Sequence, residues 1–441
     1  MYHYRNVSGV DGFAAFQPVF ETMVAVRNSR GWLPNIEDSY IRPTPTHLVA
    51  EAYRASPTRL HSSASLAEVL MWAYETCDFG PFDEERERSG FNYTGASWDY
   101  PLEIDELLTW DPSIQPVAPD VAPDQFLEGG QSVFRDAWES AGPQQRYLLF
   151  HGVAVADNHN HHDQLSFILE AAGQMMCSDS GYSRGTYSGP ERKAWYVTPA
   201  AHNTLTFDGE PASPRASNVT PASVRHAEPG LLLETKTTTE LPKHGRWSRT
   251  VCRVAADYFV VVDRVEAEEP MAVQGSLHGG RGTLEPAGDG KAFLWKYAED
   301  RYGSAARLRT WIVAPGADTV VRQGELTYIK GDYAQYPYLE TSAASFGAPW
   351  ITVLKPGPAD DAMPFEVVDL SDGARTSVLI RAGGERVLVT AANGEAVNFH
   401  GHGIETDASL AIVRWGNEGQ LLNRFRDGGT TLRAAEWTKL D

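Results

Sequence analysis

The sequence predicts an α+β protein in which a short helical part precedes a large antiparallel β-sandwich. Three observations predict this class: apolar residues with helical spacing in the first quarter, a proline-rich stretch after it, and many short β-rich segments beyond that. Apolar residues three and four positions apart form one helix face, whereas short segments bounded by turn residues are typical of strands. The 441 residues are enough for about two to four domains.

Helices are predicted within residues 1–110. Apolar residues recur with helical spacing from Phe13 to Val26, and Pro18 lies inside this run, so we expect a break or kink there. The same spacing returns from Ser65 to Cys77. A third short helix is expected over Thr44 to Arg54. Three helices are too few to close a ring of helices.

The pattern changes after a linker at 111–125. Four prolines in DPSIQPVAPDVAPD preclude a regular helix there. The following segments are β-rich and separated by turn residues, for example YLLFHGV, QLSFILE, NTLTFDG and YFVVVDRV. We therefore expect a central β-sandwich over 126–364 and a smaller C-terminal β-layer over 365–441.

The composition excludes several classes of partner. Lys and Arg number 38 against 58 Asp and Glu, a formal net charge of −20, which disfavours duplex nucleic acid and anionic membranes. No apolar run approaches the ~18 residues of a membrane helix. The 3 cysteines form no C-x-x-C pair, so neither a disulfide framework nor a thiolate zinc site is indicated. The sequence is compatible with a homo-oligomer.

A histidine cluster in VADNHNHHDQLSF is the strongest chemical signal. On a strand, His159, His161 and Asp163 would share one face and His162 the other. Two imidazoles on one face can bind one metal ion, and two His with one carboxylate suit zinc. A purely structural, hydrogen-bonded cluster is an equal alternative, and the spacing does not decide which histidine would be a ligand.

Two later motifs could complete such a site. Asp179 lies in CSDSGY and His202 lies in PAAHNTLTF. No Glu follows closely enough for the H-x-H pattern of cupins, since the next is Glu170. No G-x-S-x-G motif of a serine nucleophile is present either.

Together these motifs resemble a known family. NHNHHDQLSFILEAAGQMMCSDSGY followed by AAHNTLTFDG is similar to the core of heparinase II/III-like polysaccharide lyases, and WSRTVCRVAADYFVVVDRV is similar to a later strand pair. The resemblance extends from about Gly31 to the C-terminus. It implies an α/α toroid followed by a stacked β-sandwich, with the active site between them. Residues 1–110 would then be the remainder of a toroid whose first part is absent.

The resemblance also implies an activity and residue roles. Such enzymes cleave uronic-acid polysaccharides by β-elimination and leave 4,5-unsaturated products. His161, Asp179 and His202 would bind a largely structural zinc ion, and His159 would be a catalytic histidine. In YHYR at the start of the chain, Tyr2 is the first choice for the catalytic tyrosine and Tyr4 the second.

Other residues would border the substrate. The loop GWLPNIEDS (31–39) resembles a family loop beside the cleft. Four residues between the two motifs could contact a sugar acid through aromatic stacking and Arg–carboxylate pairs, namely Tyr182, Arg184, Tyr187 and Arg192. The implied partner is an anionic polysaccharide or oligosaccharide.

Two questions stay open at this stage. The alternative function is a non-catalytic carbohydrate-binding or scaffold protein that keeps the zinc-bearing sandwich but has lost the complete toroid site. The resemblance favours a periplasmic or secreted protein, although the first residues show no signal peptide.

Overall fold

A computed structural model describes most of the chain. The described residues are 13–43, 64–78, 111–138, 145–153, 159–184, 187–212, 219–238, 241–255, 257–288, 290–328, 332–373, 375–393 and 399–437. Tyr2, Tyr4 and the helix expected over Thr44 to Arg54 lie outside them. None of the described helices is long and apolar enough to cross a membrane.

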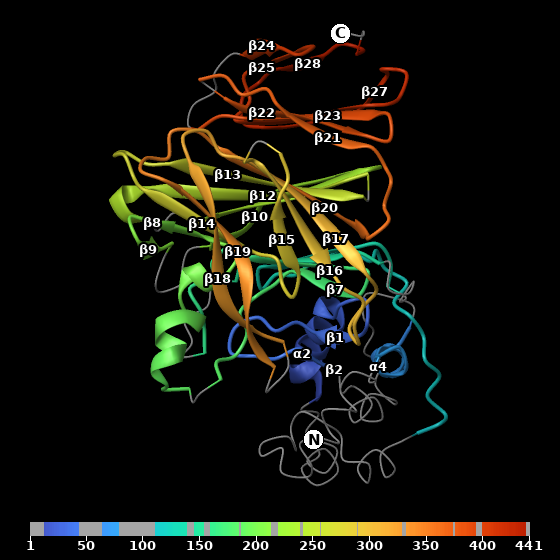
Figure 1. The fold of residues 1–441 in the computed structure, drawn as a ribbon. Helices are drawn as coiled ribbons and strands as arrows, with labels where there is room; N and C mark the ends of the chain where they lie inside the picture. Colours follow the sequence, from blue (N-terminus) through green and yellow to red (C-terminus); the bar gives the residue numbers. More distant parts are fainter. Residues whose placement is uncertain are drawn as a thin grey trace.

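Two α-helices stand at one end of the molecule (Figure 1). Helix α2 (Phe13–Val26) runs through Pro18 rather than breaking there. Pro18 lies in the second turn, where its missing N–H removes a single internal hydrogen bond. Helix α4 (Leu66–Glu75) begins with a capping box, in which the Ser65 side chain accepts from the Glu68 backbone N–H and Glu68 reaches back.

Antiparallel sheets make up nearly all of the remaining described residues, so the predicted change from helices to strands is confirmed. The described strands, in spatial order within each sheet, are β1 (Trp32–Leu33) and β2 (Arg42–Pro43); β3 (Gln125–Phe126), β4 (Gln131–Arg135), β5 (Tyr147–His151), β6 (Phe167–Ala171) and β7 (Gln174–Cys177); β10 (Val219–Glu228), β11 (Leu231–Thr238), β12 (Arg246–Val254), β13 (Tyr258–Glu266), β20 (Trp350–Pro358), β17 (Ala306–Val313), β16 (Ala292–Tyr297) and β15 (Thr283–Pro286); β18 (Asp318–Thr327), β19 (Tyr333–Ala343), β14 (Val273–His278), β8 (Leu205–Phe207) and β9 (Glu210–Pro211); β21 (Phe365–Asp369), β22 (Thr376–Ala382), β23 (Glu385–Ala391), β26 (Leu410–Trp415) and β27 (Leu421–Asp427); and β24 (Phe399–Gly401), β25 (Ile404–Thr406) and β28 (Leu432–Ala434).

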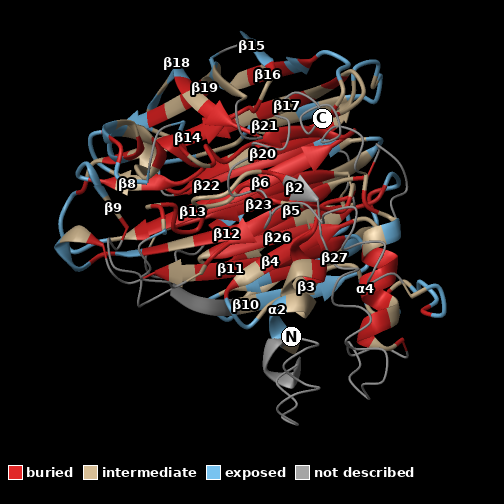
Figure 2. Ribbon diagram, turned by 90° about the horizontal axis from the view of Figure 1, so that it is seen from below, coloured by how far each residue is buried: buried red, intermediate tan, exposed pale blue. Residues whose placement is uncertain are grey.

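The sheets are stacked in layers (Figure 1). The sheet of β10–β13, β15–β17 and β20 is buried on both faces, because alternate residues of a strand point to opposite sides. In β13, Phe259 and Val261 belong to the core shared with β14 and β19, whereas Val260 and Val262 belong to the core shared with β22, β23 and β26. Buried residues accordingly fill the central strands in Figure 2.

A segment after α2 connects the helices to the sandwich. The buried carboxylate of Glu170 on β6 accepts hydrogen bonds from Asn28 Nδ2 and Ser29 Oγ, both at 2.6 Å. Tyr147 on β5 donates its hydroxyl to the Val26 carbonyl at 2.6 Å. Trp32 packs into the same apolar cluster as Tyr147. These contacts fix the connection between β1 and β2 against the β3–β7 sheet, where the candidate site lies.

Three short helices complete the described helical structure. They are the π-helix η3 (Arg192–Tyr196) and the 3₁₀ helices η4 (Pro199–Ala201) and η5 (Pro242–His244). Only η3 and η4 concern the site. They join the loop after β7 to β8, so that they carry Arg192 and position His202.

Candidate active site

The three predicted metal ligands meet in the structure. One side-chain ligand atom from each of His161, Asp179 and His202 lies within 4.8 Å of the others, and all three residues are buried. They come from three loops: His161 precedes β6, Asp179 follows β7 and His202 follows η4. The HNHHD segment is therefore a loop and not the strand on which the face assignment was based.

The hydrogen bonds of the two histidines fit a metal ion. His202 Nε2 lies 2.8 Å from the Tyr196 carbonyl, to which it can only donate, so in the neutral ring Nδ1 carries a lone pair. That Nδ1 lies 2.9 Å from Asp179 Oδ2, and two acceptors are stable at this distance only with a proton or a cation between them. His161 donates through Nε2 to Asp38 Oδ1 at 3.1 Å, and its buried Nδ1 has no hydrogen-bond partner.

The second bond of each histidine matches the usual support of a metal ligand. Metal-binding histidines almost always donate their other N–H to a carboxylate or a carbonyl. His161 does so to Asp38, and His202 does so to Tyr196. The residues present therefore fit a metal ion bound by two imidazoles and one carboxylate.

The D-S-G and H-N-T motifs have local structural reasons. Gly181 donates its N–H to Asp179 Oδ1 at 2.9 Å and has φ +68°, and a Cβ there would lie 2.6 Å from the Thr327 carbonyl. Asn203 donates to the Phe167 and Ser178 carbonyls and accepts the His278 N–H at 2.7 Å. It thereby ties the His202 loop to β6, β7 and β14.

A buried ion pair supports the same loops from below. Arg249 and Asp263 face each other on β12 and β13 at 2.8 Å, as expected for an ion pair on a sheet. Arg249 also donates to the carbonyls of Leu165 and Asn203, at 2.8 and 2.6 Å. The pair therefore holds the two histidine loops on the sheet.

Asp38 connects the metal ligands to an exposed histidine. Its side chain is 2% exposed and accepts from His159 Nδ1 at 3.1 Å, from His161 Nε2 at 3.1 Å and from Arg192 Nη2 at 2.6 Å. The His159 side chain is 63% exposed. Because Nδ1 faces Asp38, the neutral ring carries its proton on Nδ1 and its lone pair on Nε2.

A second group of titratable side chains lies beside the first. His151 Nε2 is 3.2 Å from Glu37 Oε1 and 3.7 Å from Asp163 Oδ2. Glu37 also accepts from Asn160 Nδ2 at 2.9 Å and from the His161 backbone N–H at 2.6 Å. Neighbouring residues of one loop, Glu37 and Asp38, thus contact both groups.

The carboxylates dominate the local electrostatics. Burial opposes ionisation of Asp38, but hydrogen bonds from His161 and Arg192 lower its pKa to about 2. Burial alone would lower the pKa of His202, yet the charge of Asp179 outweighs it and raises the pKa to about 9. Burial and the charge of Glu37 raise the pKa of Asp163 to about 6. The site therefore holds more negative than positive fixed charge and favours protons or cations.

The four residues expected at the substrate lie near Asp38. Tyr187 contacts the His159 ring, with centroids 4.7 Å apart, and the Arg192 guanidinium lies 4.5 Å from the Tyr187 ring. Tyr182 packs on Tyr40 at 5.4 Å. Arg184 is exposed and pairs with Glu325 on β18. Both arginines thus have a carboxylate partner within the chain.

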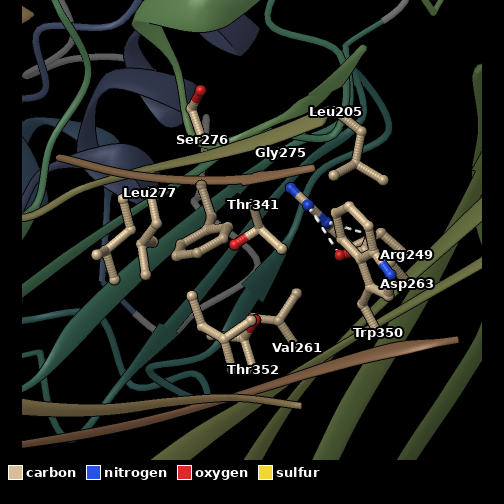
Figure 3. Close-up of a pocket in the computed structure, with 13 residues that line it drawn as sticks. Leu205, Arg249, Val261, Asp263, Gly275, Ser276, Leu277, Thr341, Trp350 and Thr352 are labelled. Atoms are coloured by element: carbon tan, nitrogen blue, oxygen red, sulfur yellow. Dashed lines mark hydrogen bonds and ion pairs between the residues drawn. The ribbon is translucent and has the colours of Figure 1, made fainter. Parts of the chain in front are cut away.

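A cavity inside the sandwich is a different feature (Figure 3). It has a volume of about 40 Å³ and lies between Leu205, Trp350 and the Arg249–Asp263 pair. Ligand pockets usually measure about 300–1,000 Å³. The cavity can hold water molecules but not a sugar, so it is a packing feature of the core.

Sequence reasoning missed Glu37, Asp38 and His151 as parts of the site. The loop 31–39 was expected beside the cleft, but no role followed for its two acidic residues. The contact between Asp38 and His161 spans 123 positions. Consecutive Glu and Asp after a Pro/Gly loop were the available signal, and such a pair is usually a solvated turn.

Comparisons with known proteins agree with this architecture. Residues 118–333 match the family model described as heparinase II/III-like, C-terminal. This range includes every described residue of the predicted site. No curated protein matches the sequence significantly.

Solved structures share the fold at low sequence identity. One heparinase III has a TM-score of 0.63 and 15% identity, over 89% of this chain and 57% of that protein. A second heparinase III structure has 0.62 and 16%, over 86% and 53%. Heparan sulfate lyase HepC from Pedobacter heparinus has 0.59 and 16%, over 88% and 54%. The chain spans a little over half the length of these proteins, and identities this low support a shared fold alone.

Proposed function

Because the chain belongs to the heparinase II/III-like family, we propose that it is a polysaccharide lyase acting on uronic-acid-containing polysaccharides or oligosaccharides. One observation carries the proposal. His159 is exposed and its Nδ1 is held by the buried Asp38 at 3.1 Å, which leaves the Nε2 lone pair available to a substrate. A histidine oriented in this way by a carboxylate is suited to remove a proton.

The proposed reaction is a β-elimination. His159 Nε2 takes the proton from C5 of the uronic acid, the C5–H electron pair forms the C4–C5 double bond, and the C4–O4 bond breaks. The leaving O4 must then be protonated, and we assign this step to Tyr2, with Tyr4 as the second choice. A neutral tyrosine with an ordinary pKa of about 10 can donate this proton without any shift.

The uronate carboxylate must be neutralised before C5 can lose its proton. Arg184 is the better placed of the two arginines, because its side chain is 54% exposed, whereas that of Arg192 is 8% exposed and bound to Asp38. We propose that Arg184 contacts the substrate directly. Tyr187 and Tyr182 would border the sugar, and Arg192 would act from beneath Tyr187.

We also propose that the metal is zinc and that its role is structural. His161, Asp179 and His202 would hold it. A bound zinc ion would supply positive charge that joins three loops of the site. Helices α2 and α4 would belong to the α/α toroid that accompanies the sandwich in this family.

The test is ultraviolet absorbance during incubation with separate solutions of alginate, heparan sulfate, chondroitin, hyaluronan and polyglucuronate. Elimination creates a C4–C5 double bond conjugated to the carboxylate, so absorbance should rise on one polymer. New reducing ends without this absorbance would indicate hydrolysis instead. Binding of a polymer without either product would favour the non-catalytic carbohydrate-binding alternative.

A further inference from the structure

The second titratable group consists of Glu37, His151 and Asp163, hereafter the Glu37 cluster. Its residues come from three separate elements: the β1–β2 connection, the end of β5 and the loop before β6. One ligand atom from each lies within 4.8 Å of the others. None of the three belongs to the set of His161, Asp179 and His202.

The spacing of these atoms fits tetrahedral zinc coordination. Zinc binds nitrogen and carboxylate oxygen at about 2.0–2.2 Å, so two ligands at a tetrahedral angle lie roughly 3.3–3.5 Å apart. His151 Nε2 lies 3.2 Å from Glu37 Oε1 and 3.7 Å from Asp163 Oδ2. Both distances lie within a few tenths of an ångström of that range.

The buried carboxylate of Asp163 points to a missing cation. Asp163 is 1% exposed, and its Oδ2 has no hydrogen-bond partner although it faces His151. A buried charged oxygen without a partner is costly unless it is paired or binds a metal. In the described part of the chain, the ion pairs of Glu37 and Asp163 are made with His151 alone. One imidazole can supply at most one positive charge for these two carboxylates.

The cluster also has an open side. The side chains of His151 and Asp163 are 6% and 2% exposed, whereas that of Glu37 is 20% exposed. A cation could therefore enter past Glu37 and keep a water molecule as its fourth ligand. Glu37 simultaneously accepts the His161 backbone N–H, so a cation here would stiffen the loop that carries Asp38.

We propose that the Glu37 cluster is a second binding site for a divalent cation of the zinc type, separate from the site of His161, Asp179 and His202. Its ligands are Glu37 Oε1, His151 Nε2 and Asp163 Oδ2. The chain would then bind two zinc ions, and the second would fasten the β1–β2 connection to the sandwich. The inference does not depend on lyase activity.

Zinc stoichiometry of the full chain tests this proposal. The protein is stripped with a chelator, reconstituted with zinc and analysed by elemental analysis after desalting, with circular dichroism as the check of folding. We expect two equivalents in the unchanged protein, one in Asp163→Asn, one in His202→Gln and none in the double variant. His278→Gln is the matched control, because His278 is 1% exposed but lies outside both groups, and it should keep two.

Several results would overturn the proposal. These are one equivalent in the unchanged protein, two in folded Asp163→Asn, none in folded Asp163→Asn, or none in His202→Gln. The last two would mean a single shared site. If Asp163→Asn does not fold, Glu37→Gln replaces it with the same criteria, because the more exposed Glu37 tolerates change better. A single equivalent in the unchanged protein would indicate that a proton on His151 balances the cluster instead.

Discussion

The two halves of the candidate site are built differently. Asp179 and His202 lie on loops of the sandwich and are 1% and 0% exposed, held by Gly181 and Asn203. Glu37 and Asp38 lie on the β1–β2 connection, which reaches the site from the helical end of the molecule. The sandwich half supplies ligand atoms, whereas the connection supplies carboxylates that orient the histidines between them.

This difference separates binding from orientation. A substitution in the sandwich half should remove the metal and weaken the fold. A substitution in the connection should leave most of the fold intact and misdirect His159. Each prediction below compares the two halves by measuring metal content, melting temperature and turnover on the same variants.

The largest effect is expected for His159→Ala. A general base contributes typically about 10²–10⁴-fold to a rate, so kcat should fall by that factor. Metal content and melting temperature should not change, because the side chain is 63% exposed. Turnover is followed by ultraviolet absorbance on the polymer that the protein cleaves.

The control for this variant is His400→Ala, since the His400 side chain is 69% exposed and lies in the C-terminal layer. It should keep full activity. If His159→Ala instead loses the metal, the roles of His159 and His161 are exchanged.

His161→Ala should lose the metal of the first site and melt earlier. A ligand that binds only the folded state stabilises it by about 2.7 kcal/mol at a concentration 100 times its Kd. We expect the loss of a stabilisation of this size, measured as thermal unfolding with and without added zinc. His162→Ala is the control, because the bond that ties it to Val197 is made by its backbone N–H. Unchanged zinc content and melting in His161→Ala would contradict the first metal site.

Most of the fold and half of the site were predictable from sequence. The β-rich segments alternate turn residues with short strands, so the change from helices to a layered sandwich follows from local pattern. His161, Asp179 and His202 stand in motifs whose neighbours have local jobs, as Gly181 and Asn203 show. Motifs of this kind carry their own signal along the chain.

The connection half has no such signal. Glu37 and Asp38 contact residues more than 100 positions away, and their positions depend on how Glu170 and Tyr147 anchor the segment after α2. Side chains in a loop acquire these roles only through tertiary packing. The assignment of His159, His161 and Asp163 to one strand face was wrong for the same reason: the loop conformation there is set by contacts with Glu37 and Asp38, not by strand periodicity.

The smallest of the three effects, and the sharpest test of the connection, is expected for Asp38→Asn. The amide keeps the shape of Asp38 but loses the negative charge and one acceptor, so it cannot satisfy Arg192, His161 and His159 together. Substitution of such a supporting carboxylate typically costs about 10–100-fold in activity or metal affinity. We expect kcat to fall by this factor with little change in KM, and the pH profile of kcat to shift, because the imidazolium of His159 loses its partner. Glu325→Gln, which removes the partner of Arg184 rather than of His159, is the control and should leave the pH profile in place. A variant that melts earlier but keeps both kcat and the pH profile would reduce Asp38 to a purely structural link, and the contrast between the two halves of the site would then concern stability alone.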